Sequence, residues 1–368
     1  MTHNGSPIKH GVFIMPYHVP EKPLAQCYDE DLELIVRAEE LGFEEFWIGE
    51  HHTMKYENIV MPEIFIARAL GETKSIRLGP APVCLQQHHP AHVASRLAFL
   101  DHLSKGRLNL CFGSGSVTAD QELYGLDPQK GPDMVEEATN IILYLWSNDP
   151  PYYYDGQFWK IDLTKHVDEE TLIGYIHRPL QKPHPPICMP GMSPKSSTMK
   201  KAAQLGFSPF AHCLVTGNVV ADVLRTHEKA TRETGRRPNR SDYKVARSIF
   251  LADTTKEAVK RVRTNSVGQK YEYIGRLFDK GLGRRIYKRD LNMPDAECNL
   301  DFLMTEQIIA GDVNEVLKRL LQLVEETGPF GTLVMMSDDW DDKASWIHSM
   351  ELFAKELMPA FNKAVGSV

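Results

Sequence analysis

The feature that most constrains the fold of this chain is an alternation of short apolar runs with amphipathic segments. Eight apolar runs predict strands at residues 11–15, 43–49, 75–85, 107–115, 185–191, 207–213, 243–253 and 330–337. Each is followed by a segment of helical periodicity, as in residues 28–42, which end at a glycine. Strands that are apolar throughout are typical of a parallel sheet covered by helices on both faces. Eight such units favour a (β/α)8 TIM barrel of the α/β class over a doubly wound sheet.

Two segments interrupt this alternation. Residues 148–185 are rich in proline and aromatic residues, and residues 268–304 show an irregular pattern. We interpret both as insertions, after the fourth and the seventh unit of a single domain that spans residues 1–368.

Composition narrows the class of protein. The chain has 368 residues, 42% hydrophobic residues and a net charge of -7, which is ordinary for a globular protein and argues against a nucleic-acid partner. No apolar run approaches the length of a membrane span, and the polar N-terminus lacks the apolar core of a signal peptide. The six cysteines are scattered without a CxxC pair, so neither a disulfide framework nor a zinc site is indicated. We therefore expect a cytoplasmic protein.

Chemically useful side chains follow seven of the eight predicted strands. In a (β/α)8 barrel the loops after the strands carry the reactive groups. These residues are therefore our candidates for the functional site, and they are Tyr17, His18, Glu50, His51, His52, Gln86, His88, Gly113, Ser114, Lys195, Ser196, Ser197, Thr198 and Trp340, while His212 and Cys213 follow the sixth strand.

Some of these residues also have a purely structural interpretation. Adjacent histidines point in different directions, so we expect at most one of His51 and His52 to face a pocket, and we favour His51. His88 and its neighbour precede Pro90 and could simply cap a helix. Tyr17 and His18 could be packing residues at the rim.

A helix beginning near residue 196 has the ingredients of a phosphate site. Lys195 supplies a cation, Ser196 to Thr198 supply hydroxyl groups, and the first turn of a helix has free backbone N–H groups. The alternative is that one of the serines only caps the helix. The chain has neither a Walker motif nor a GxGxxG after a strand, which excludes the usual nucleotide signatures.

Four motifs together resemble the luciferase-like flavin monooxygenases, the superfamily of bacterial luciferase. They are "GEHH" at 49–52, "SIRLGPAPVCLQQHHPAHVA" at 75–94, "LDHLSKGRLNLCFGSG" at 100–115 and "SSTMKKAAQLG" at 196–206. The two ends of the chain look closest to the diketocamphane and limonene monooxygenase branch.

The resemblance implies a TIM barrel, a homodimer, and reduced FMN supplied by a separate flavin reductase. It implies oxygenation of a small organic substrate through a flavin hydroperoxide. His51 matches the catalytic histidine, which we expect Glu50 or a backbone group to orient. Ala81 and Pro82 match a cis peptide under the flavin ring, Gly113 and Ser114 match the loop along the flavin, and Lys195 to Thr198 match the phosphate helix. We expect the substrate to contact Tyr17, His18, Gln86, His88 and Trp340.

The chain also departs from the luciferase pattern. Ser114 stands where that pattern has an arginine, so phosphate neutralisation falls on Lys195 and the helix dipole. Such a site suits a flavin that enters and leaves as a substrate. The alternatives are a deazaflavin-dependent oxidoreductase of the same fold and a flavin-binding protein without chemistry of its own. A metal-dependent hydrolase would need an HxH motif or a bridging lysine at the strand ends. The first strand ends in "MPYH" instead, so no metal is expected.

Overall fold

The computed structural model describes residues 7–280 and 283–366, which belong to two compact units. The larger unit comprises residues 1–47, 55–58 and 189–368, and the smaller unit comprises residues 48–54 and 59–188. Residues 1–6, on which the argument against a signal peptide partly depends, lie outside the described residues.

The larger unit is built on a buried sheet in the order β2-β1-β12-β10-β9-β8. Its central strands are parallel and in register, with Lys9 opposite Thr332 and Ile14 opposite Ser337. Buried rings of different strands pack against one another, as Phe210 of β9 does against Phe13 of β1 and Trp47 of β2. The strands are β1 (Lys9–Ile14), β2 (Glu45–Ile48), β8 (Ile187–Gly191), β9 (Ser208–Ala211), β10 (Lys244–Leu251) and β12 (Thr332–Ser337).

Helices follow these strands and cover the sheet. They are α1 (Leu24–Glu40), α6 (Ser197–Leu205), α7 (Gly217–Glu233), α8 (Thr255–Val262), α12 (Lys343–Leu352) and α13 (Met358–Gly366), with a single wider turn at Phe353–Leu357 between the last two. In α7 the apolar residues recur at helical spacing, so Val220, Val223 and Leu224 are buried while the opposite face is exposed.

The second predicted insertion is helical where it was expected to be irregular. It contains α9 (Ser266–Asp279) and α10 (Leu300–Glu306), apart from residues 281–282, which are not described. A further strand and helix follow it that the sequence analysis did not predict. These are β11 (Ile308–Gly311), which pairs with the far end of β10, and α11 (Val313–Thr327).

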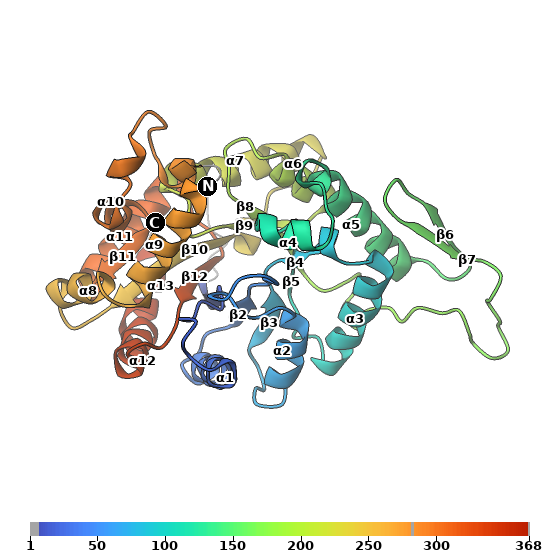
Figure 1. Ribbon diagram of the computed structural model, residues 1–368, viewed down its shortest axis with the longest axis horizontal. Coiled ribbons are helices and arrows are strands. Elements are labelled where there is room, and N and C mark those ends of the chain that lie inside the picture. The colour runs from blue at the N-terminus through green and yellow to red at the C-terminus, as the bar shows by residue number, and fades with distance from the viewer. Residues whose placement is uncertain (1–6, 281–282, 367–368) are drawn as a thin grey trace. The chain divides into compact units, whose positions relative to one another are not determined.

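The smaller unit contains the third and fourth strand–helix units. The third predicted strand is split into β3 (Arg77–Pro80) and β4 (Val83–Cys84), and β5 (Leu110–Gly113) pairs in parallel with β4 and with the first two residues of β8. The helices are α2 (Pro62–Ala69), α3 (Pro90–Leu103), the short α4 (Thr118–Leu123) and α5 (Gly131–Ser147). The first insertion forms an antiparallel hairpin of β6 (Tyr152–Asp155) and β7 (Lys160–Leu163), which projects beyond α5 (Figure 1).

All eight predicted strands are present. Strands β1, β12, β10 and β9 pair in parallel in that order, and so do β4, β5 and β8. Strand and helix alternate along the chain, as predicted for the (β/α)8 class. None of the helices in the described ranges combines the length and the apolar composition that crossing a bilayer requires.

Candidate active site

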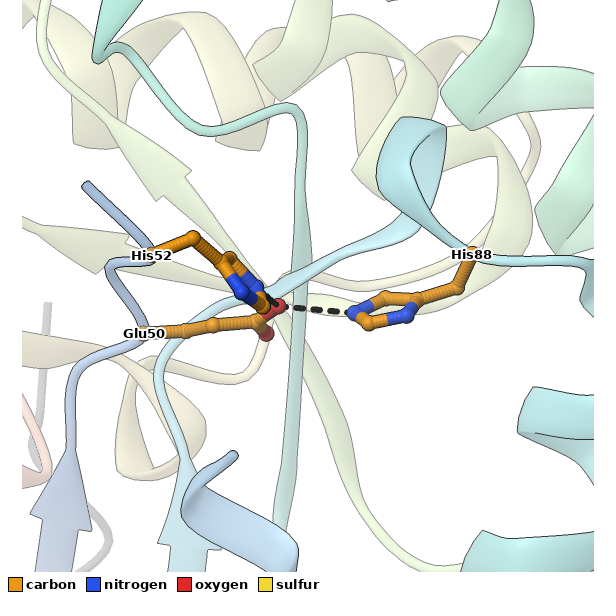
Figure 2. Close-up of side chains that lie close together, drawn as sticks. All are labelled: Glu50, His52 and His88. Atoms are coloured by element: carbon orange, nitrogen blue, oxygen red, sulfur yellow. Dashed lines mark hydrogen bonds and ion pairs between the residues drawn. The ribbon is translucent and has the colours of Figure 1, made fainter. Parts of the chain in front are cut away.

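The centre of the site in the smaller unit is the carboxylate of Glu50, which is 1% exposed. Its Oε1 atom lies 2.7 Å from Nε2 of His88 and 3.1 Å from Nε2 of His52 (Figure 2). Its Oε2 atom accepts a hydrogen bond of 3.1 Å from the backbone N–H of Cys84. The loop after β2 and the loop after β4 are therefore joined through one side chain.

The charge of Glu50 follows from these contacts. Burial raises the pKa of Glu50, but the hydrogen bonds from His52, His88 and the Cys84 backbone outweigh burial and lower it to about 2. Glu50 is therefore a carboxylate at neutral pH and only accepts hydrogen bonds, so each neutral imidazole must carry its proton on Nε2. Hydrogen bonds to Glu50 thus bring the three side chains together.

His52 is engaged at both ring nitrogens. Its Nδ1 atom lies 3.0 Å from the hydroxyl of Tyr124, and because Nε2 carries the proton, Nδ1 accepts the hydrogen bond from that hydroxyl. This agrees with the expectation that one of the two adjacent histidines serves the structure.

His51 lies beside a different carboxylate. Its Nδ1 atom is 3.8 Å from Oδ2 of Asp120, a residue of α4 that is 2% exposed. Glu50 contacts His52 and His88, and the positioning of the His51 ring by Glu50 or a backbone group stays a prediction. The backbone N–H of His51 donates to the carbonyl of Ile59 at 3.1 Å.

Asp120 also organises the loop that carries His51. Its Oδ1 atom accepts hydrogen bonds from the backbone N–H groups of His52 and Thr53 and from the Thr53 hydroxyl, at 3.2, 2.7 and 2.6 Å. Burial raises the pKa of Asp120, but these bonds and His51 lower it to about 2. The result is an ionised carboxylate beside the imidazole of His51.

Gln86 holds the loop after β5. Gln86 donates from Nε2 to the carbonyl of Ser114 at 2.5 Å. Its Oε1 atom would lie 2.7 Å from a Cβ added at Gly131, which is too close for a side chain there. Gly115 has φ of +71°, and a Cβ there would approach Sγ of Cys84 to 2.9 Å, so only glycine suits this turn. Buried Oε1 atoms of Gln86 and Gln87 find no hydrogen-bond partner among the described residues.

The peptide bond between Ala81 and Pro82 is cis, as predicted. The backbone N–H of Ala81 donates to the carbonyl of Ile48 at 2.8 Å, which places this bond next to the end of β2 in the smaller unit. Gly113 is the last residue of β5 and is buried.

The predicted phosphate site lies at the start of α6 in the larger unit. The hydroxyl of Ser196 accepts from the backbone N–H of Met199 at 3.4 Å, so Ser196 is the cap that the alternative interpretation required. Ser197 and Lys195 are exposed and Thr198 is half-buried. The backbone N–H of Lys195 donates to Asp222 at 2.6 Å, which places a carboxylate beside this helix end.

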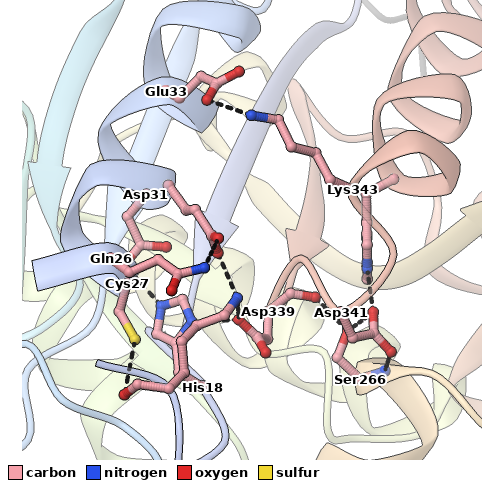
Figure 3. Close-up of polar contacts among 12 residues, drawn as sticks. His18, Gln26, Cys27, Asp31, Glu33, Ser266, Asp339, Asp341 and Lys343 are labelled. Atoms are coloured by element: carbon pink, nitrogen blue, oxygen red, sulfur yellow. Dashed lines mark hydrogen bonds and ion pairs between the residues drawn. The ribbon is translucent and has the colours of Figure 1, made fainter. Parts of the chain in front are cut away.

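His18 does not offer a ring nitrogen to a substrate. Its Nδ1 atom lies 2.6 Å from Asp339 and its Nε2 atom 3.0 Å from Asp31 (Figure 3). Burial lowers the pKa of His18, but the two aspartates outweigh burial and raise it to about 9. Lys22 adds a second cation, 2.6 Å from Asp339 and 2.5 Å from Glu30. His18 is thus a buried imidazolium that ties the loop after β1 to α1 and to the loop after β12, and its expected contact with substrate is withdrawn.

Two other candidates of the larger unit are buried near strand ends. The ring of Tyr17 stacks on Tyr56 with 5.5 Å between centroids. Trp340 is 6% exposed, and its Nε1 atom has no hydrogen-bond partner among the described residues.

Asp120 and Tyr124 are the members of the smaller-unit cluster that the sequence analysis missed. Both follow β5 by seven or more residues, so the rule that reactive groups directly follow strands did not select them. An acid within "GSGSVTAD" was the available signal.

Known proteins are similar to this chain over most of its length. A family model described as luciferase-like monooxygenase matches residues 8–329. The 3,6-diketocamphane 1,6-monooxygenase of Pseudomonas putida is 28% identical over 376 residues, covering 95% of this chain and 97% of that protein. Limonene 1,2-monooxygenase of Rhodococcus erythropolis is 28% identical over 371 residues, covering 100% of this chain and 90% of that protein.

A solved structure is also similar. The oxygenating constituent of 3,6-diketocamphane monooxygenase from Pseudomonas putida, in complex with FMN, matches with a TM-score of 0.87 and 28% identity. The match covers 96% of this chain and 98% of that one.

Proposed function

This chain belongs to the luciferase-like monooxygenase family, and from that premise we propose that it uses reduced FMN and dioxygen to oxygenate a small organic substrate. The family match over residues 8–329 confirms the resemblance inferred from the motifs. The relatives named above confirm the narrower resemblance to the diketocamphane and limonene branch.

The observation that best supports this function is the pair of His51 and Asp120. Oxygenation with a reduced flavin needs a side chain that holds or passes a proton near neutral pH, and imidazole is the side chain suited to that task. The ionised carboxylate of Asp120 lies beside this imidazole, with Oδ2 3.8 Å from Nδ1 of His51. We assign the catalytic role to His51 and the positioning role to Asp120.

The residues of the smaller unit fit a flavin ring. A flavin carries N–H groups, and the partnerless Oε1 atoms of Gln86 and Gln87 are acceptors for such groups beside the glycine loop. Ala81, Pro82, Gly113 and Ser114 would hold the ring, as the resemblance implies. When bound, reduced FMN supplies the two electrons that reduce one oxygen atom to water.

The start of α6 fits a phosphate that binds weakly. Lys195 and the backbone and hydroxyl groups of Ser196 to Thr198 would bind it, but Asp222 lies next to them and opposes an anion. This balance supports a flavin that is exchanged with a partner flavin reductase in each turnover.

The remaining parts of the proposal follow from the family. We place the protein in the cytoplasm, as a homodimer in which residues 1–368 act as one domain. Tyr17, Gln86 and Trp340 remain our candidates for contact with the substrate.

The test is a screen of small cyclic ketones, terpenes and aldehydes with the purified chain, a flavin reductase, NADH and FMN under labelled dioxygen. We expect the wild-type protein to form a product that carries one labelled oxygen atom. We expect His51→Gln to form no such product. Oxygen-independent reduction of a substrate by a reduced deazaflavin would contradict the proposal in favour of the deazaflavin alternative. Flavin binding without turnover would favour a non-catalytic flavin-binding protein.

A further inference from the structure

The histidine at position 88 forms a second carboxylate–imidazole pair in the smaller unit. The Nε2 atom of His88 lies 2.7 Å from Oε1 of Glu50, the shortest contact of that carboxylate. The backbone fixes both partners, because the N–H of His88 donates to Leu85 at 3.2 Å and the N–H of Cys84 donates to Glu50 at 3.1 Å. The ring of His88 is therefore held in one orientation.

The proton on this ring can be placed by elimination. Glu50 accepts from Nε2 of His88 and from Nε2 of His52, so both rings carry their proton on Nε2 when neutral. The Nδ1 atom of His52 is used by Tyr124 at 3.0 Å. The Nδ1 atom of His88 has no hydrogen-bond partner among the described residues and keeps an unshared electron pair.

Among the described residues, the unoccupied Nδ1 atom distinguishes His88 from its structural neighbours, since Tyr124 occupies the Nδ1 atom of His52. His89, the next residue, shows the structural alternative, since its Nδ1 accepts from the backbone N–H of Ala91 at 3.3 Å and caps α3. His88 instead has a buried carboxylate behind it and a side chain that is 10% exposed in front. This is the arrangement in which a carboxylate fixes the tautomer of a general base.

We propose that Nδ1 of His88 takes up and returns a proton during the reaction, with Glu50 as its positioning residue, an inference that rests on the proposed function. In the overall reaction, substrate, dioxygen and reduced FMN give oxygenated substrate, FMN and water. Two electrons of reduced FMN and two hydrogens leave with one oxygen atom as water. His88 holds one of these hydrogens as a proton on Nδ1 and delivers it to the departing oxygen, while the Glu50 carboxylate stabilises the imidazolium.

The first measurement does not depend on activity. The full-length protein is labelled with 15N-histidine, and the ring resonances of His88 are assigned with His88→Gln as reference. We expect the neutral form of the ring to carry its proton on Nε2, and the tautomer equilibrium to shift in Glu50→Gln. A ring protonated at Nδ1 in the wild-type protein would overturn the inference.

The second measurement is turnover with the substrate that the oxygenation screen identifies. We expect kcat of His88→Gln to fall roughly 100-fold while KM for reduced FMN changes little, and added imidazole to restore part of kcat. His92→Gln is the matched control, because His92 is an exposed histidine nearby in the sequence, in the first turns of α3. Equal losses in both variants, or wild-type kcat in His88→Gln, would overturn the inference alone. A wild-type protein that oxygenates nothing would instead remove the proposed function, and this inference with it.

Discussion

Two buried carboxylates, Glu50 and Asp120, distinguish the histidines of the smaller unit from one another. Glu50 binds His52 and His88, whereas Asp120 lies beside His51. Each carboxylate is buried and ionised, so each presents a negative charge to the imidazole it faces. His51 and His52, which are adjacent in the sequence, therefore face different carboxylates.

The positioning role of Asp120 predicts the effect of Asp120→Asn. An asparagine keeps an oxygen that can accept from Thr53 and His52, so the loop is expected to persist, but the charge beside His51 is lost. We expect turnover to fall roughly 10- to 100-fold, as for other groups that orient a functional imidazole. Steady-state kinetics measure this, with Glu122→Gln on the exposed side of α4 as control. Equal activity of Asp120→Asn and the control would refute the role.

The ion pairs of His18 predict a dependence of stability on pH. The charged groups that face its ring or join its pairs are Asp31, Asp339, Lys22 and Glu30. Its pKa of about 9 in the folded protein lies above the ordinary value of 6.5. The protonated ring therefore stabilises the fold fully below pH 6.5, by on the order of 3 kcal/mol, and this contribution is lost as pH rises through 9.

Urea unfolding at pH 6.5 and at pH 9.5 measures that contribution. We expect the free energy of unfolding to be lower at pH 9.5, and the difference between the two pH values to shrink in His18→Gln. A variant with the same pH dependence as the wild-type protein would show that other groups produce it.

The predicted site residues differ in the sequence feature that identified them. Glu50, His51 and His88 were predicted because they directly follow strands, and the structure brings Glu50 and His88 into contact. The sequence could not show which carboxylate faces which imidazole, because a shift of one residue in the loop would exchange the partners. The burial of His18 among carboxylates from two distant elements likewise depends on tertiary contacts that local sequence does not show.

At the scale of elements, α9 is held against α8 by a close approach at Gly268. A Cβ at this position would lie 2.2 Å from the backbone carbonyl oxygen of Val262, so a larger residue must displace one of the helices. We expect Gly268→Ala to lower the free energy of unfolding by roughly 1–3 kcal/mol, the usual cost of overpacking.

Gly275 on the same helix is the matched control. A Cβ there would meet Arg284 at 3.5 Å, an ordinary contact. Because alanine favours helix over glycine by about 1 kcal/mol, Gly275→Ala is expected to be neutral or stabilising. Urea unfolding of both variants measures the difference, and equal destabilisation would show that the close approach at Gly268 does not limit the packing.

The elements themselves were largely predictable, and the exceptions have identifiable causes. The repeated strand–helix pattern carried the prediction because parallel strands buried on both faces are apolar throughout. The pair β11 and α11 was missed although Asp312 and Glu315 mark the start of α11, and the Asp312 side chain accepts from the Glu315 N–H at 3.0 Å. This pair follows residues 268–304, which show no regular periodicity in the sequence. Eight strand–helix units were predicted without it.

At the scale of the whole molecule, the exposed apolar residues of α2 and α3 support the proposed homodimer. Ile64 is 70% exposed, and Phe99 and Leu103, one turn apart on α3, are 64% and 49% exposed. The two helices are neighbours, since Arg96 of α3 pairs with Glu63 of α2 at 3.0 Å. Apolar side chains on adjacent helices form the kind of patch that a partner surface covers.

This patch predicts that Phe99→Glu separates the subunits. A stable dimer buries roughly 1,200–2,000 Å² in total, and a charge in the apolar centre of that area is desolvated without a partner. We therefore expect the variant to sediment as a monomer at micromolar concentrations at which the wild-type chain sediments as a dimer. Tyr153→Glu is the control, because Tyr153 is 51% exposed on the hairpin of the first insertion. A dimer that survives Phe99→Glu and dissociates in Tyr153→Glu would move the interface from α2 and α3 to that hairpin.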